Sequence, residues 1–257
     1  MPATDSGLLP MQFFSTLDLI ALAFFLGAWL AYHVGVEWTE HGRKGLNTRM
    51  NAYRDIWMMR MLERDVRIVD TQIMASLQNG TAFFASTSLI AIGGSLTLMR
   101  STDDLLAVAS TLPFGIETSR ALWELKTIGL AVIFAYAFFK FAWSYRLFNY
   151  VAILIGALPP HKDRNKPSAR THAVRTGKLC AAAGLHFNRG QRAFFFALGY
   201  LGWFVSPWVF IVSTAAVVIV TWRRQFASSA WLAMGEGRDV VRRTLAEERA
   251  KSRNPVG

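Results

Sequence analysis

Residues 125–158 read LKTIGLAVIFAYAFFKFAWSYRLFNYVAILIGAL, the longest apolar run in the chain, and Pro159-Pro160 ends it. An α-helix rises about 1.5 Å per residue, so a helix over the whole run measures about 50 Å. The hydrocarbon core of a bilayer is only about 30 Å thick. The run therefore predicts a membrane-spanning helix that continues beyond the membrane on one side.

Two cations, Lys140 and Arg146, lie inside this run. If Lys126 marks the outer boundary, Arg146 lies about 30 Å along the helix, at the inner interface, and Lys140 lies about 21 Å along, close enough to snorkel toward it. Alternatively, Lys140 or Arg146 faces a pore or polar cavity, because a cation in mid-bilayer is costly and commonly functional. Three aromatic residues at this depth are typical of an interfacial belt: Trp143, Tyr145 and Tyr150.

The helical angles divide the polar residues of this run into two groups. At 100° per residue, Arg146, Asn149 and Tyr150 lie within about 60° of one another, whereas Lys140 lies roughly opposite Asn149. Arg146 and Asn149 are therefore candidates for one polar face, and we do not expect a single cavity to take Lys140 as well.

The end of the run, Leu147–Leu158, is about 18 Å of apolar helix beyond the predicted membrane edge. Exposed apolar surface of that size rarely stays bare. A second apolar stripe repeats at steps of three or four within residues 49–78, as on one face of a helix. We therefore expect a cytoplasmic helical layer built from residues 45–79 and 147–192, completed by a second copy or another protein if the chain alone cannot cover it.

Three further apolar runs, residues 17–36, 81–99 and 193–222, predict three more spans. The second of them is expected to continue the 49–78 helix almost without a break. Ser206-Pro207 lies in the middle of the third, where we expect a kink in one helix, because each half of the run is too short to cross alone.

The fold class expected from these runs is all-α, an integral membrane protein with four transmembrane helices over residues 15–222. Residues 1–14 carry no Lys or Arg, so the first apolar run is interpreted as a retained span behind a short N-terminus. Residues 223–257 are expected to form a basic, partly helical tail.

The distribution of Lys and Arg predicts the orientation in the membrane. Residues 37–79 contain seven and residues 146–192 contain nine, whereas residues 100–125 contain two and the chain before Glu37 none. We therefore expect a multi-pass inner-membrane protein with those two basic segments in the cytoplasm and the N-terminus outside. The tail, with eight Lys or Arg, disagrees, because four spans would put it outside. The expected membrane-interface anchors are Trp38, Lys126, Trp143, Tyr145, Tyr150, Trp222, Arg223 and Arg224.

Composition excludes several function classes. The chain is 53% hydrophobic with a net charge of +11, and its charges lie between apolar runs, which favours contact with anionic lipid and argues against nucleic acid. Cys180 is the single cysteine, and the five histidines lack metal-helix spacing. No catalytic or cofactor motif is apparent, so we expect no metal, no cofactor and no enzymatic activity.

The span over residues 81–99 carries a regular set of hydroxyl side chains at Thr81, Ser88 and Ser95. Small and hydroxyl residues on one face allow close helix packing, and they can also line a permeation path. Gln78 and Asn79 lie at the inner mouth of this span. Together with Lys140, Arg146 and Asn149, the residues Gln78, Asn79, Ser88 and Ser95 are the candidate polar face or pore.

Several of these residues match a family pattern. Leu77-Gln78-Asn79-Gly80 opens a span rich in Ser, Thr and Ala, Lys126 opens the next, and Arg146-Leu147-Phe148-Asn149 lies near its end. With Arg54 and Trp57, the pattern resembles the membrane-protein family called domain of unknown function 599, over roughly residues 15–222. The resemblance implies four helical spans and no established activity.

The function expected from these features is an oligomeric inner-membrane protein with a channel-like or transport-like role, whose basic inner mouths favour anions or anionic lipid. The alternative is a non-catalytic accessory subunit of a larger membrane protein complex, with the apolar 147–158 segment and the basic tail as docking surfaces. Homo-oligomers or other membrane subunits are the expected protein partners.

Overall fold

The computed structural model describes residues 14–110 and 119–234, and within these ranges the chain is helical and has no strands. The predictions for residues 1–13 and for the tail beyond 234 concern parts of the chain outside the described residues. The longer helices are α1 (Thr16–Glu37), α2 (Leu46–Met61), α3 (Ile68–Arg100), α4 (Thr102–Ser110), α5 (Arg120–Gly156), α6 (Pro167–Tyr200) and α7 (Pro207–Phe226). Short 3-10 turns occur at η2 (Gly42–Lys44), η3 (His161–Asp163) and η4 (Leu201–Phe204).

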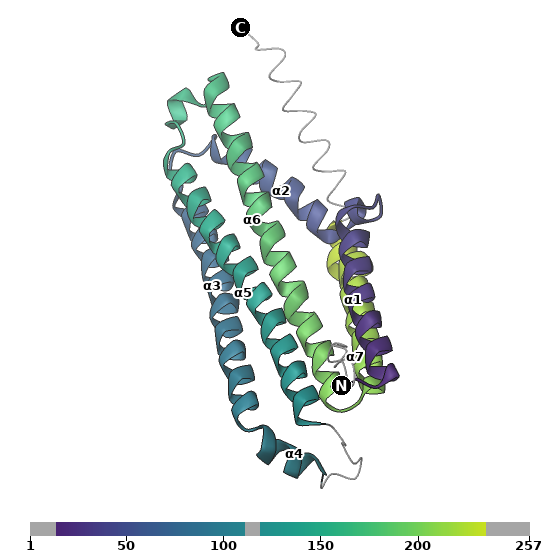
Figure 1. Ribbon diagram of the computed structural model, residues 1–257. Helices are drawn as coiled ribbons and strands as arrows, with labels where there is room; N and C mark the ends of the chain where they lie inside the picture. The colour runs from purple at the N-terminus through teal and green to yellow at the C-terminus, as the bar shows by residue number, and fades with distance from the viewer. Residues whose placement is uncertain (1–13, 111–118, 235–257) are drawn as a thin grey trace, which may run out of the picture.

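The bundle is elongated, and its long helices run along one common direction (Figure 1). Among the described residues, four helices are long and apolar enough to cross a membrane: α1, α3, α5 and the helix that starts at Pro207. The all-α membrane fold with four such helices is therefore confirmed.

The single kinked span expected over residues 193–222 is wrong. Helix α6 ends at Tyr200, and α7 begins anew at Pro207 and runs back beside it (Figure 1). Pro207 occupies the first turn of α7, where its missing N–H costs nothing. The Ser206 hydroxyl caps the same helix by accepting a hydrogen bond from the backbone N–H of Val209 (3.1 Å). Proline thus starts a helix here instead of bending one.

Helix α6 is long enough to traverse the bundle but too polar to face lipid on all sides. It lies between α5 and the α1–α7 pair, and α2 crosses its first half (Figure 1). Two of its glycines mark that crossing: a Cβ at Gly177 would lie 2.8 Å from Asp55 Oδ1, and one at Gly184 would lie 2.6 Å from Arg54 Nη1. In the second half of α6 the polar side chains from His186 to Arg192 are half-buried against protein neighbours, whereas the first half exposes Arg170, Arg175 and Lys178.

The extra pass of α6 brings the end of α7 back to the α2 end of the bundle (Figure 1). Arg223 and Arg224 therefore lie at the same end as the basic residues of η2 and α2. The chain after α7 is held there as well, since Trp231 Nε1 donates to Lys44 O (2.9 Å) and the Arg49 guanidinium lies 4.1 Å from the Trp231 ring centre. Among the described residues that follow the last predicted span, Arg223 and Arg224 thus lie at the same end of the bundle as the basic segment 37–79.

The apolar end of α5 is covered within the chain itself. Leu147, Phe148, Val151, Ile155 and Leu158 are buried in one cluster with residues of α2, α3 and α6. Their partners in the cluster include Met58, Met61, Leu62, Met74, Ala169, Ala173, Cys180 and Ala183. Part of the 147–158 segment therefore packs on α2, as expected, whereas Ile153 on its other face is 66% exposed.

The continuous helix expected from residue 49 to the end of α3 is broken. The chain turns between Met61 and Ile68, so Val66 and Val69 of the predicted stripe are exposed while Met74 is buried. A buried carboxylate holds the turn: Asp70 accepts from Trp57 Nε1 (2.7 Å) and from Arg64. From Ile68 onward the prediction is correct, and α3 passes Asn79-Gly80 without a break.

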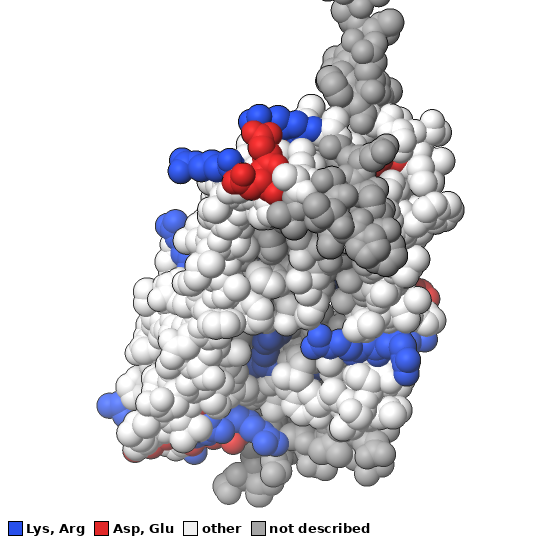
Figure 2. Space-filling model, turned by 90° about the horizontal axis from the view of Figure 1, so that it is seen from below, with Lys and Arg blue, Asp and Glu red and all other residues white. Residues whose placement is uncertain are grey.

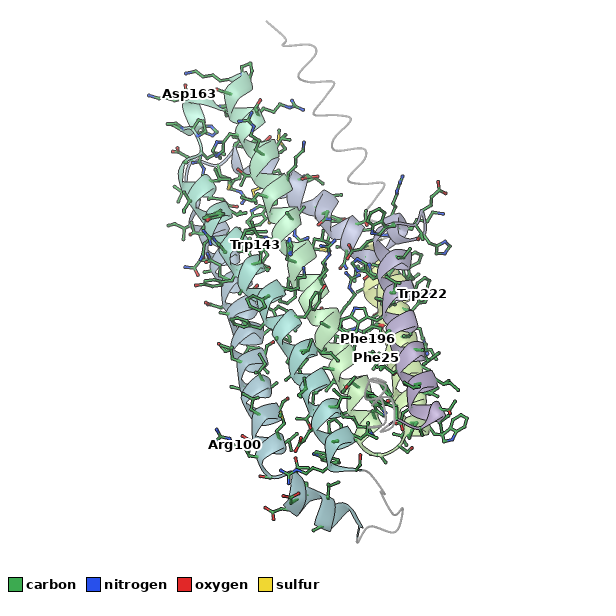
Figure 3. The ribbon with its side chains drawn as sticks, viewed as in Figure 1. Phe25, Arg100, Trp143, Asp163, Phe196 and Trp222 are labelled. Carbon is green, nitrogen blue, oxygen red and sulfur yellow. The ribbon has the colours of Figure 1, made fainter. Side chains whose placement is uncertain are left out.

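A second core, rich in aromatic rings, fills the bundle nearer the α4 end. Phe25 of α1 and Phe196 of α6 face each other in it, with ring centres 5.7 Å apart (Figure 3). Phe210 and Trp203 stack at 5.1 Å, and Tyr200 lies edge-on to both. These rings close the space between α1, α6 and α7.

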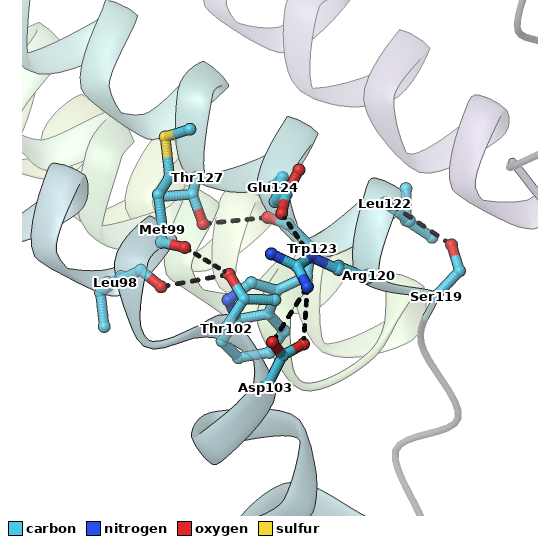
Figure 4. Close-up of polar contacts among 10 residues, drawn as sticks. All are labelled: Leu98, Met99, Thr102, Asp103, Ser119, Arg120, Leu122, Trp123, Glu124 and Thr127. Atoms are coloured by element: carbon cyan, nitrogen blue, oxygen red, sulfur yellow. Dashed lines mark hydrogen bonds and ion pairs between the residues drawn. The ribbon is translucent and has the colours of Figure 1, made fainter.

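The α4 end is tied together by short polar contacts (Figure 4). Thr102 donates its hydroxyl to Met99 O (2.8 Å) at the end of α3, and Arg120 at the start of α5 binds both Asp103 and Glu124. Figure 2 views the molecule from this end: acidic and basic side chains gather at the upper left, and further basic side chains lie at the centre, at the right and along the lower left edge, with uncharged surface between them.

Candidate functional site

The structure brings together two of the residues proposed for a polar face. Gln78 Nε2 donates to Asn149 Oδ1 (2.6 Å), which joins α3 to α5. Asn79, the next residue of α3, is exposed. The Gln78–Asn149 pair is thus a polar contact between two helices.

The predicted pore lining on α3 is wrong for Ser88 and Ser95. Both side chains are buried, and their hydroxyls donate to carbonyls one turn earlier in the same helix, Phe84 O (2.8 Å) and Ala91 O (2.9 Å). Small side chains here let α3 and α5 approach closely, and the helix backbone satisfies the hydroxyls. This is the close-packing alternative of the sequence interpretation.

Lys140 and Arg146 do not share a site. The Lys140 ammonium lies 5.0 Å from the Tyr136 ring centre. Arg146 is exposed, donates to Tyr150 Oη (2.7 Å), and has the Trp143 ring on its other side. Arg146 among exposed aromatic rings fits the interfacial reading of this segment.

Lys126 is not an interface anchor, because it is buried with 3% exposure. Its ammonium donates to Trp203 O (2.9 Å), while the indole N–H of the same Trp203 donates to Asp18 Oδ1 (2.7 Å). Asp18 also caps the start of α1 together with Ser15. A buried cation of α5 and a buried carboxylate of α1 thus both bind Trp203 of η4. These contacts join the three elements and have a structural role.

The other predicted anchors lie on the surface. Trp143 and Trp222 are on different sides of the bundle, and both are nearer the α2 end than Phe25 is (Figure 3). The exposed members of this group are Trp38, Trp143, Tyr145, Tyr150, Trp222, Arg223 and Arg224.

A polar cavity that the sequence did not predict lies between α1, α2, α6 and α7. Two adjoining hollows of about 130 and 170 Å³ share Val36, Asn47, Asn188, Arg192 and Gln225 in their walls. Each exceeds the roughly 30 Å³ that one water occupies in the liquid. Further polar residues of the walls are Tyr32, Glu37, Thr48, Asn51, Gln191, Thr221 and Arg224.

A carboxylate and two guanidinium groups form a charged cluster at this cavity, and two of its members, Glu37 and Arg192, lie in the cavity wall. Arg189 Nε lies 3.0 and 3.2 Å from the two Glu37 oxygens, and Arg192 pairs with Oε1 of the same carboxylate. Glu37 is at the end of α1, and the two arginines are one turn apart on α6, which places both on the same helix face. The group carries one more positive than negative charge.

An amide donor in the cavity wall lacks a partner. Gln225 is 9% exposed, and its Nε2 has no hydrogen-bond partner among the described residues. Buried polar groups nearly always have a partner in protein or ordered water, so an orphaned donor in a polar hollow indicates a place where a ligand or water binds. Asn47, Asn188 and Gln191 supply further amide groups.

The chemistry of the walls favours an oxyanion. Guanidinium groups bind carboxylate and phosphate oxygens through paired, charge-assisted hydrogen bonds, and amides can add neutral donors. Cations are disfavoured, because Arg192 and Arg224 both line the hollow.

The charged residues of this site are visible in the sequence, but the prediction did not place Arg189 and Arg192 in a helix that passes through the bundle. Residues 147–192 were predicted to belong to a cytoplasmic helical layer beyond the spans, and Glu37 was not among the candidate site residues. Only the length of α6 brings Arg189 and Arg192 into the bundle beside Glu37.

The family model for a protein of unknown function, DUF599, matches residues 20–230. The chain belongs to the DUF599 family. The matched range of this DUF599 protein includes every residue of the cavity wall, as well as the Gln78–Asn149 contact. No curated protein and no solved structure matches the chain.

Proposed function

We propose that this DUF599 protein is an oligomeric inner-membrane protein with a transport-like role, and that the cavity between α1, α2, α6 and α7 takes up an anionic solute. The observation that carries the proposal is the excess of positive charge in a polar hollow formed by two apolar spans, α1 and α7, together with α2 and α6. Charge in such a place is costly and generally serves binding or passage.

The orientation in this proposal follows from the basic residues. The cavity lies at the α2 end, where the basic segments and the end of α7 gather. By the positive-inside rule this end is cytoplasmic, and the start of α1 is extracytoplasmic. The cavity then faces anions of the cytoplasm and anionic lipids of the inner leaflet.

The aromatic core favours a transporter-like mechanism over an open channel. Phe25, Phe196 and Phe210 pack in the space below the cavity, and all three are buried. A solute at Arg192 therefore meets packed rings and needs them to move before it can pass. Such one-sided access is typical of proteins that alternate between two states.

Arg192→Gln tests this function. We expect the purified protein to bind inorganic phosphate or sulfate in isothermal titration, and Arg192→Gln to weaken that binding at least about 10-fold, because a charged hydrogen bond contributes about 1.5–3 kcal/mol. Proteoliposomes with the same variants measure uptake of labelled phosphate and sulfate.

The matched control is Arg223→Gln, which removes an exposed arginine of α7 at the same end of the bundle. It should bind and transport like the wild type. Equal binding by all three proteins, or no binding of either anion by the wild type, contradicts an anion site in this cavity.

The outer face of α3 favours the second candidate, an accessory subunit of a larger complex. Phe83 and Ile90 are exposed there, and the surroundings of Gly93 and Gly94 are open, with no other part of the described chain within 4 Å of a Cβ built at either. Small residues beside large apolar ones allow another membrane helix to pack closely.

Cysteine cross-linking separates self-assembly from the accessory role. In a Cys180→Ala background, Gly94→Cys should give an oxidised dimer if two copies meet on α3, whereas Val212→Cys on the exposed face of α7 should not. Native mass spectrometry then reports whether other subunits co-purify. A monomer in both measurements contradicts assembly through α3.

A further inference from the structure

The Glu37 carboxylate is bound to the Arg192 guanidinium, which is the group that an anion in the cavity would need. Arg192 lines both hollows, yet its described hydrogen bond is to the Glu37 carboxylate. The Glu37 and Arg192 side chains are 9% and 12% exposed, so the pair is largely shielded from solvent. The protein thus carries its own carboxylate at the candidate anion site.

The two arginines hold Glu37 in different ways. Arg189 approaches both carboxylate oxygens through Nε and also donates through Nη2. Arg192 donates through Nη2 alone, and its guanidinium lies 6.0 Å from the Tyr32 ring centre in the cavity wall. Arg189 can therefore keep Glu37 in place when Arg192 turns to another partner.

We propose that Glu37 is an internal competitor for the anion site, displaced from Arg192 by an incoming phosphate-type oxyanion while it stays paired with Arg189. This inference rests on the proposed function in that it requires the cavity to take an anion. A doubly charged phosphate outcompetes a single carboxylate for Arg192, and the orphaned Gln225 amide and the neighbouring Asn188 and Asn47 amides are placed to donate to its remaining oxygens.

The competition explains an otherwise uneven arrangement. One carboxylate neutralises only one of two guanidinium groups, so the three side chains together carry a net positive charge that a bound anion can offset.

The test is phosphate titration of the full chain in nanodiscs of phosphatidylcholine. Removing a competitor strengthens binding, so Glu37→Gln should bind inorganic phosphate about 10-fold more tightly than the wild type. The matched control Glu40→Gln removes an exposed carboxylate close by and should bind like the wild type. The double variant Glu37→Gln/Arg192→Gln should lose the gain.

The outcomes separate this inference from the proposed function. If wild-type binding depends on Arg192 but Glu37→Gln binds equally or more weakly, the competitor role is wrong and the anion site stands. If neither protein binds phosphate, both proposals fail. Nanodiscs with phosphatidylglycerol distinguish the sources of the anion, since a lipid headgroup at Arg192 would suppress phosphate binding.

A second variant keeps the test informative if Glu37→Gln does not fold. Glu37→Asp retains the charge but shortens the reach by one methylene, so it can keep Arg189 while its contact with Arg192 is weakened. We expect phosphate affinity between those of the wild type and Glu37→Gln, and affinity at or below the wild-type value would overturn the proposal.

Discussion

Lys126→Met should lower the stability of the protein by about 3–5 kcal/mol, the cost typical of removing one partner from a buried charge pair. Lys126 and Asp18 are 3% and 5% exposed and attract each other across Trp203, which contacts both. Without the ammonium, the Asp18 carboxylate remains buried with no opposite charge, and Trp203 O loses its donor. Thermal unfolding in detergent measures the change.

A double-mutant cycle distinguishes charge pairing from lost packing. Asp18→Asn keeps an oxygen for the Trp203 indole but removes the charge, and Asp18→Asn/Lys126→Met should be less destabilised than the sum of the single variants. Lys162→Met, at an exposed lysine, should leave stability unchanged. Strict additivity in the cycle would show that the two charges do not interact.

Gly190→Leu should destabilise the bundle by about 3 kcal/mol or more, because α5 and α6 touch at this position. A Cβ built on Gly190 lies 2.8–3.0 Å from ring atoms of Phe141, which is fully buried. The Phe141 ring cannot retreat, since Phe84 stacks on it at 5.3 Å and Phe187 contacts it at 5.6 Å.

The matched control is Gly27→Leu on α1. A Cβ at Gly27 has nothing within 4 Å, and Leu is the better helix former, so this variant should match or exceed the wild type in thermal unfolding. Equal loss of stability in both glycine variants would show that the contact with Phe141 does not set the cost.

Much of the architecture could be predicted from the sequence because lipid imposes a simple rule on exposed helices. The apolar runs of α1, α3 and α5 were recognised, and the length of the last run required a covering layer beyond the membrane. The buried partners of Leu147 and Val151 meet that requirement.

The candidate site was poorly predicted because the sequence does not distinguish a polar residue that lines a site from one that only pairs with its own helix or with the core. Ser88 and Ser95 have the spacing of a pore lining, yet their own helix satisfies both hydroxyls. Lys126 was predicted to be an anchor at the membrane edge. It is instead buried in the core, where its ammonium donates to the carbonyl oxygen of Trp203, a residue distant in sequence. Partners of this kind are set by tertiary packing.

The sequence by itself determined the fold class, the apolar spans α1, α3 and α5 and the distribution of basic residues between them, because hydropathy and charge report on contact with lipid. Only the tertiary structure decided that α6 passes through the bundle, that Pro207 starts a new helix, and that Glu37 meets Arg189 and Arg192 beside a cavity. The physical reason is that hydropathy reports exposure to lipid. A helix surrounded by other helices need not be apolar on all sides, because it does not face lipid, and it can carry the charges of a binding site.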